Sequence, residues 1–148
     1  MRKDERVLGA IKEHMGEAEF LFRVDGVPVF LSDRIIDEAG SCFVVKLRNA
    51  DTGDFDDVIF VGGRIMADRD VADMAIAHEL GHIRHGESRS YLADLDIEIQ
   101  ADAFAMEYLG LSGDEARDLL VETFVLQGID LGSREIAARV RALGRYAP

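Results

Sequence analysis

Three of the chain's four histidines and one glutamate lie within the stretch AIAHELGHIRHG, residues 75–86. In a helix, His78 and His82 are one turn apart, so both imidazoles project from the same face. This is the separation that two ligands of one tetrahedral zinc ion need. Glu79 is rotated off that direction, where it can reach a metal-bound water without binding the metal. An H-E-x-x-H motif on a helix places two histidines and one glutamate in this way.

The alternative is a buried helix whose histidines only form hydrogen bonds within the core. Residues 75–77 and Leu80 are apolar enough for this helix to be buried, where unpaired imidazoles are costly. Gly81, between the two histidines, allows another element to pack close to them. The pattern therefore favours a metal site over a helix with core histidines.

Two histidines do not hold a zinc ion, so a third ligand is needed. In the next predicted helix, Asp94, Glu98 and Asp102 are spaced i, i+4 and i+8 and share one face. Such acids repel each other by a few tenths of a kcal/mol per pair, and a nearby cation turns that cost into a gain. The alternative is a solvated acidic stripe. The residue types alone leave the third ligand open.

The segments HELGH and EIQADAFA together resemble the gluzincin metallopeptidases, most closely the ImmA/IrrE-type family and the single-domain minigluzincins. The similarity covers roughly residues 57–109, with VIFV in the position of the strand that precedes the active-site helix. It implies a bound Zn²⁺ with Glu98 as the third ligand, and Asp94 is the main rival for that position. It also implies that Asp102 accepts a hydrogen bond from a ligand histidine, taken to be His78, and so fixes its tautomer.

His85 shares the helix face of the other two histidines, but it is a poor third ligand. Seven residues of straight helix span about 10 Å, too far for both ends to bind one ion. A histidine at the helix end, favoured by the helix dipole, is the simpler interpretation. His14 is interpreted as a surface residue. The donors near the motif that could stabilise an oxyanion are Arg89, Tyr91, Tyr108 and His85, and none is selected.

The elements that position these residues fall into a β-rich first half and a helical second half. Periodicity predicts a helix over 3–15, a hairpin within 20–32, strands at 42–49 and 57–63, and helices near 69–85, 90–109, 113–127 and 133–144. We therefore expect one α+β domain over residues 1–148. It would be a small zincin-like domain with an N-terminal helix and a short antiparallel or mixed, meander-like sheet, followed by the two site-bearing helices.

Local signals support these boundaries. Asp25-Gly26 is a hairpin-turn signal, and Pro28 places its strand at an edge or at a strand start. Ser112 and Glu115 form a capping-box pattern. The glycines at the predicted helix ends are Gly86, Gly110 and Gly128.

Composition excludes several classes of partner. The net charge of −12 disfavours nucleic acid and anionic membranes, which need a positive surface. No stretch approaches the roughly 20 apolar residues of a membrane span, and the N-terminus lacks a secretory pattern, so we expect a cytoplasmic protein. The lone Cys42 lies in the apolar run CFVV and is expected to be a buried, inert thiol.

These residues predict a zinc-dependent endopeptidase in which Glu79 is the general base. The expected substrate is a protein or peptide. The resemblance implies a narrow range of substrates that are regulatory proteins. The strand DVIFV could offer an edge on which an extended peptide lies by β-augmentation. The alternative is a zinc-binding regulatory or interaction module that keeps the fold but cleaves little.

Overall fold

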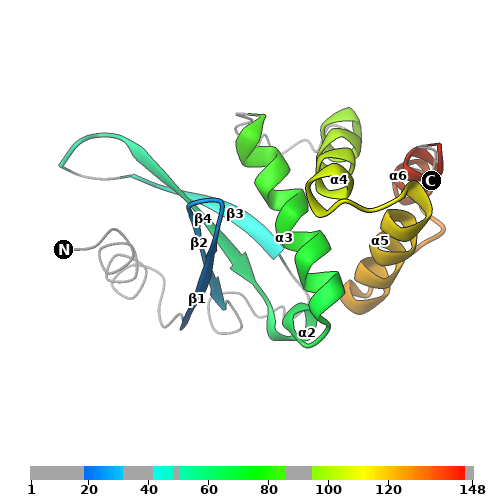
Figure 1. Cartoon of the computed structure of the whole chain (residues 1–148), viewed down its shortest axis with the longest axis horizontal. Helices are drawn as coiled ribbons and strands as arrows, with labels where there is room; N and C mark the ends of the chain where they lie inside the picture. The colour runs from blue at the N-terminus through cyan, green and yellow to red at the C-terminus, as the bar shows by residue number, and fades with distance from the viewer. Residues whose placement is uncertain (1–18, 32–41, 49–50, 86–94, 146–148) are drawn as a thin grey trace. The chain divides into compact units, whose positions relative to one another are not determined.

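The structure, a computed structural model, describes residues 19–31, 42–48, 51–85 and 95–145. In this part of the chain, four strands precede five helices, so the protein has an α+β fold (Figure 1). Its contacts divide the chain into two compact units, Met1–Arg64 and Ile65–Pro148, which are described separately. The helix predicted over 3–15 lies outside the described residues, and the single domain over 1–148 stays a prediction.

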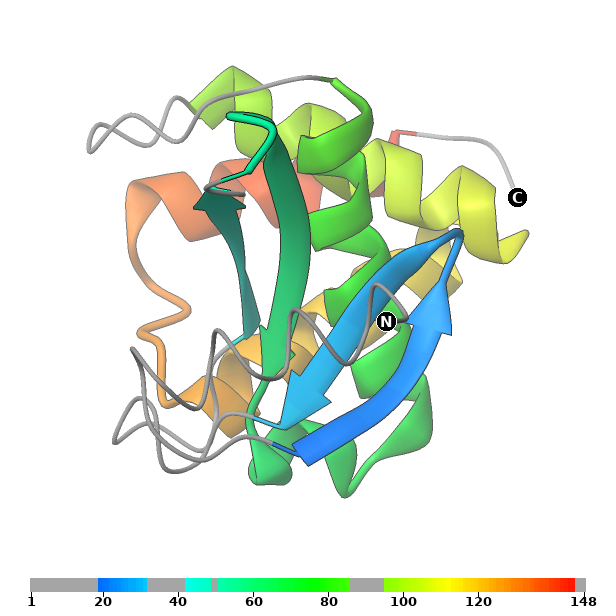
Figure 2. The same cartoon turned by 90° about the vertical axis from the view of Figure 1, so that its left-hand side faces the viewer.

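The first unit contains a mixed four-stranded sheet. Its strands are β1 (Glu19–Val24), β2 (Val27–Leu31), β3 (Cys42–Arg48) and β4 (Phe55–Val61), in the order β1-β2-β4-β3. β2 and β4 are parallel, whereas β1 pairs with β2, and β3 with β4, in antiparallel fashion. Figure 2 shows the β1–β2 hairpin in blue and β4 in green.

The expectation of a meander is therefore wrong. β4 lies between β2 and β3 because its run Val58–Val61 is fully buried and needs a neighbour on each side. β3, which alternates half-buried and exposed residues towards its end, lies at an edge of the described sheet. The prediction that DVIFV offers an edge to a peptide is also wrong, because β4 is an inner strand that pairs with β3 along its length and with β2 over Ile59–Val61. The outer strands are β1 and β3.

The hairpin between β1 and β2 confirms the turn signal of the sequence. Asp25 and Gly26 have φ angles of 48° and 82°, as a type I′ turn requires at both central residues. Pro28 is the second residue of β2, and the ladder to β4 begins only at Val29. Of the two positions predicted for this proline, the structure shows the strand start, where its missing N–H is tolerated.

Aromatic side chains form the core of this sheet. The Phe43 and Phe60 rings stack with their centroids 5.4 Å apart, and Phe30 lies 6.0 Å from Phe60. Phe20 on β1 meets Phe30 edge-on. Cys42 is only half-buried, so the expectation of a buried thiol holds in part.

The helices are α2 (Gly63–Met66), α3 (Arg69–Arg84), α4 (Leu95–Leu109), α5 (Gly113–Gln127) and α6 (Arg134–Gly144). Asp68 caps α3 by accepting a hydrogen bond from the Val71 N–H. The predicted capping box of α5 is present, with Ser112 and Glu115 bonded reciprocally. None of the described helices combines the length and the apolar character needed to cross a membrane.

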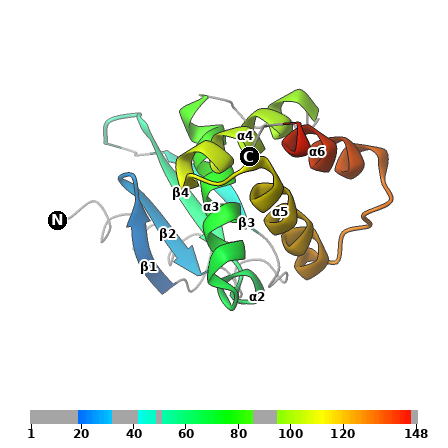
Figure 3. The same ribbon diagram turned by 45° about the vertical axis from the view of Figure 1, so that its right-hand side comes forward.

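The core of the second unit lies among α3, α4, α5 and α6, which pack against one another (Figure 3). Its buried residues come from all four of these helices: Met74, Ala77, Ala105, Met106, Ala116, Leu120, Phe124 and Leu143. Helix α4 ends at Gly110 and α5 at Gly128, both with the positive φ that glycine tolerates and as the sequence predicted.

Helices α3 and α4 lie close together at Gly81. A Cβ at this position would lie 3.2 Å from the Cα of Ala101 and 3.2 Å from Phe104. Because one of these atoms belongs to the backbone of α4, the neighbour cannot simply rotate away. Gly81 therefore sets the spacing between the two helices, as expected from its place between the two histidines.

We predict that Gly81→Ala destabilises the protein by about 1–2 kcal/mol, because overpacking outweighs the gain in helix propensity. The matched control is Gly144→Ala, where the nearest atom is the flexible end of Arg117 at 3.7 Å. Urea unfolding of both variants measures the difference. Equal stability of the two would contradict a tight contact between α3 and α4.

Candidate metal centre

Helix α3 presents His78 and His82 on one face, as the i, i+4 spacing predicts. Both side chains are nearly buried, and their ring centroids lie 4.7 Å apart with planes at 83°. The two Nε2 atoms are separated by 3.1 Å. Two imidazole nitrogens therefore converge on one point, which lies beside α4.

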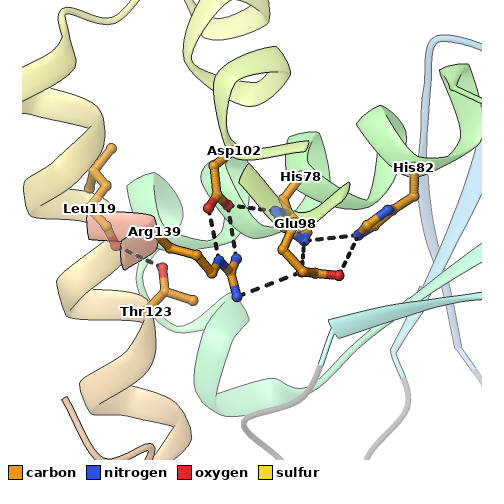
Figure 4. Close-up of polar contacts among 7 residues, drawn as sticks. All are labelled: His78, His82, Glu98, Asp102, Leu119, Thr123 and Arg139. Atoms are coloured by element: carbon orange, nitrogen blue, oxygen red, sulfur yellow. Dashed lines mark hydrogen bonds and ion pairs between the residues drawn. The ribbon is translucent and has the colours of Figure 1, made fainter. Parts of the chain in front are cut away.

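Glu98 on α4 supplies the third group at that point (Figure 4). Its Oε2 lies 3.0 Å from Nε2 of His78, and its Oε1 lies 3.2 Å from Nε2 of His82. The sequence-predicted residues His78, His82 and Glu98 are thus brought together from two helices. These three residues can hold a metal ion.

The size of this triangle suits a small cation. Ligand atoms at about 2.0–2.2 Å from a tetrahedral ion lie about 3.3–3.6 Å from one another, by simple geometry. The separations of 3.0 to 3.2 Å within the group differ from that by a few tenths of an ångström. An ion can therefore be accommodated without moving either helix.

Asp102, one turn after Glu98 on α4, lies beside His78, the contact that the family resemblance implied. Its Oδ1 is 2.7 Å from Nδ1 of His78, and the carboxylate is 1% exposed. In the neutral imidazole, an Nδ1–H that donates to this carboxylate leaves the lone pair of Nε2 facing His82 and Glu98. A hydrogen bond of this kind fixes the tautomer and orientation of a ligating histidine.

Arg139 on α6 is the residue that sequence reasoning missed. Its Nε donates to Oδ2 of Asp102 at 2.8 Å and its Nη2 donates to Oδ1 at 2.9 Å. Its Nη1 lies 3.6 Å from Oε2 of Glu98, and its guanidinium covers the ring of Phe124 on α5 at 4.9 Å. Figure 4 shows Asp102 between Arg139 and His78.

A signal for Arg139 does exist in the sequence. In α6 the apolar residues Ile136, Val140 and Leu143 follow a helical stripe, and Arg139 occupies the i+3 position of that stripe. A charged residue on an otherwise apolar face needs a buried partner of opposite charge. The stripe thus indicates that α6 carries a buried ion pair, but it does not say which acid is the partner.

The charges of this network shift the pKa values of its members. Burial alone would lower the pKa of His78. The negative charge of Asp102, together with hydrogen bonds from His78 to Asp102 and to Glu98, raises this pKa to about 10. Burial opposes the charge of Glu98, yet hydrogen bonds from His78 and His82 hold its pKa far below the usual range. The pKa of Asp102 is likewise lowered against burial, chiefly through its hydrogen bond from Arg139.

Glu79, predicted as the general base, is buried, with 5% of its surface exposed. It follows His78 directly on α3, and its negative charge helps to raise the pKa of both His78 and Arg139. The carboxylate therefore lies within the same electrostatic network as the three candidate ligands. Its role as a base stays a prediction.

The remaining candidates of the sequence lie elsewhere or cannot be placed. His85 is the exposed C-cap of α3, with its ring 6.2 Å from that of Phe104, in keeping with a terminal histidine. Tyr108 is 46% exposed and stacks on Phe104. Four candidates fall outside the described residues, namely His14, Arg89, Tyr91 and Asp94.

Comparison of the chain with known protein families, curated proteins and solved structures finds no match. The functional interpretation therefore depends on the chemistry of the network itself.

We predict that the purified protein binds about one zinc ion per chain and that binding raises its thermal midpoint. A ligand present at 100 times its Kd stabilises the folded state by about 2.7 kcal/mol. Glu98→Ala is expected to lose the ion, whereas Glu107→Ala, an exposed glutamate on the same helix, retains it. Retention by Glu98→Ala and loss by Asp94→Ala would move the third ligand to Asp94.

The metal-free protein should lose stability as the pH rises from about 7 towards 10. Because the pKa of His78 is raised to about 10 in the folded state, its protonated form contributes stability fully below its ordinary pKa of 6.5. That contribution disappears as the pH passes through 10. The acidic groups facing the imidazole are Asp102, Glu98 and Glu79.

Urea unfolding of the chelator-treated protein at several pH values tests this, with His78→Gln as the comparison. The variant should show a flatter pH profile over the same range. An equally steep decline in both proteins would assign the effect to other groups.

Proposed function

We propose that the chain is a zinc-dependent endopeptidase with a zincin-like fold, similar to the gluzincins. The observation that carries this proposal is the convergence of two imidazole nitrogens and one carboxylate within 3.0 to 3.2 Å, with Glu79 buried beside them. Two nitrogen ligands and one oxygen ligand form a donor set that suits zinc and leaves a fourth position open.

The chain's own residues divide the remaining work. Zinc bound at this site would polarise the scissile carbonyl and lower the pKa of a bound water. Glu79 would accept the proton of the attacking water and then deliver it to the nitrogen of the leaving amine. His78, held by Asp102, would direct its Nε2 lone pair to the ion. Peptide hydrolysis follows from these roles.

The substrate in this proposal is a protein or peptide. The sequence resemblance adds that the range of substrates is narrow and consists of regulatory proteins. A zinc-binding module without cleavage is the second candidate. It would use the same three ligands and would not need Glu79. The two functions are therefore separated by the consequence of removing the Glu79 carboxylate.

Glu79→Gln should abolish peptide cleavage by the zinc-loaded protein while leaving zinc content unchanged. Loss of a general base costs roughly 10²- to 10⁴-fold in rate. The assay is mass-spectrometric detection of new termini in a mixture of proteome-derived peptides. Asp73→Asn, an exposed acid on the same helix, is the matched control and should cleave normally.

Two results would go against the enzyme. Cleavage that survives in Glu79→Gln would arise from another source, and a zinc-loaded protein that cleaves no peptide in the mixture would favour the binding module.

A further inference from the structure

We infer that Arg139 is a positioning residue that holds Asp102, and through it the ring of His78, in the ligating orientation. This inference rests on the proposed zinc site but not on peptidase activity. Asp102 Oδ1 accepts from His78 and also from Arg139, so one oxygen joins the imidazole to the guanidinium. The second oxygen accepts from Nε of Arg139, which fixes the plane of the carboxylate.

Arg139 also supplies the charge that keeps this carboxylate buried. Asp102 is 1% exposed, and an isolated carboxylate in such a place is costly unless it is paired and fully hydrogen-bonded. The forked guanidinium makes two parallel hydrogen bonds to it, which a single ammonium group does not reproduce. Without this partner, Asp102 would have to turn away from His78 or remain buried as a charge without its ion pair.

The position of Arg139 is in turn set by two further helices. It lies 37 positions after Asp102, on α6, and its guanidinium stacks over the buried Phe124 of α5. The aliphatic neighbours Ile136 and Val140 pack against the same core. The docking of the last helix is therefore coupled to the orientation of a metal ligand on α3.

The sign of the effect on metal affinity distinguishes positioning from simple electrostatics. The Arg139 guanidinium lies 3.6 Å from Oε2 of Glu98, so its positive charge opposes a cation at the ligand group. If charge were its main effect, removing it would tighten metal binding. If it acts as a positioning residue, removing it weakens metal binding, because His78 loses its fixed orientation.

The test is the zinc affinity of Arg139→Met in the full chain, measured by competition with a chromophoric chelator. We expect binding about 10- to 100-fold weaker than in the wild type, the usual effect of removing an outer partner of a ligand histidine. Arg141→Met, which alters an exposed arginine on the same helix, should bind zinc as the wild type does. Unchanged or tighter binding by Arg139→Met would overturn the inference.

A double-mutant cycle with Asp102→Asn shows whether Arg139 acts through Asp102. In that case Arg139→Met adds little to the loss already caused by Asp102→Asn. Additive losses would overturn the inference. Where Arg139→Met fails to fold, Arg139→Lys keeps the cation but loses the fork, and a loss of about tenfold is expected. Wild-type affinity in folded Arg139→Lys would overturn the role of the fork.

The visible spectrum of the cobalt-substituted protein gives a second readout. A changed ligand orientation alters the Co²⁺ absorption bands, which a loss of global stability alone does not. If the wild type binds zinc and Arg139→Met weakens it, the inference holds even where no peptide is cleaved. If peptide cleavage depends on Glu79 but Arg139→Met binds zinc with wild-type affinity, the inference fails and the proposed function stands.

Discussion

The second unit depends on the burial of one carboxylate, Asp102, among three helices. A charge that is 1% exposed is costly unless it is paired and hydrogen-bonded, and here α3 supplies His78 while α6 supplies Arg139. Each contact specifies the position of one helix relative to α4. The network that orients a candidate ligand thus also contributes, beside the apolar core, to how these helices pack.

The contact at Gly81 makes this arrangement possible. Because no side chain separates α3 from α4 at this residue, the side chain of Glu98 can reach both His78 and His82. A wider spacing would leave room for water between the carboxylate and the imidazoles. The two histidines are thus candidate ligands, and the glycine between them is the spacer that lets Glu98 approach both.

Much of this architecture could be predicted from local patterns. The Asp25-Gly26 turn and the Ser112–Glu115 capping box are signals carried by adjacent residues, and both are present. The pairing of the strands could not be predicted, because the apolar sequence of β4 indicates burial but does not indicate which strands flank it. Arg139 could not be assigned a partner for a similar reason, since the sequence shows a charge on an apolar face but not the 37-residue contact that satisfies it.

The charges of the site favour the close approach of His78, His82 and Glu98. Three acids, Glu79, Glu98 and Asp102, raise the pKa of the Arg139 guanidinium, and they raise that of the His78 imidazole to about 10. At neutral pH the proton on His78 therefore supplies part of the positive charge that a bound cation would bring. On the proposed assignment, a metal ion held by His78, His82 and Glu98 would displace this proton.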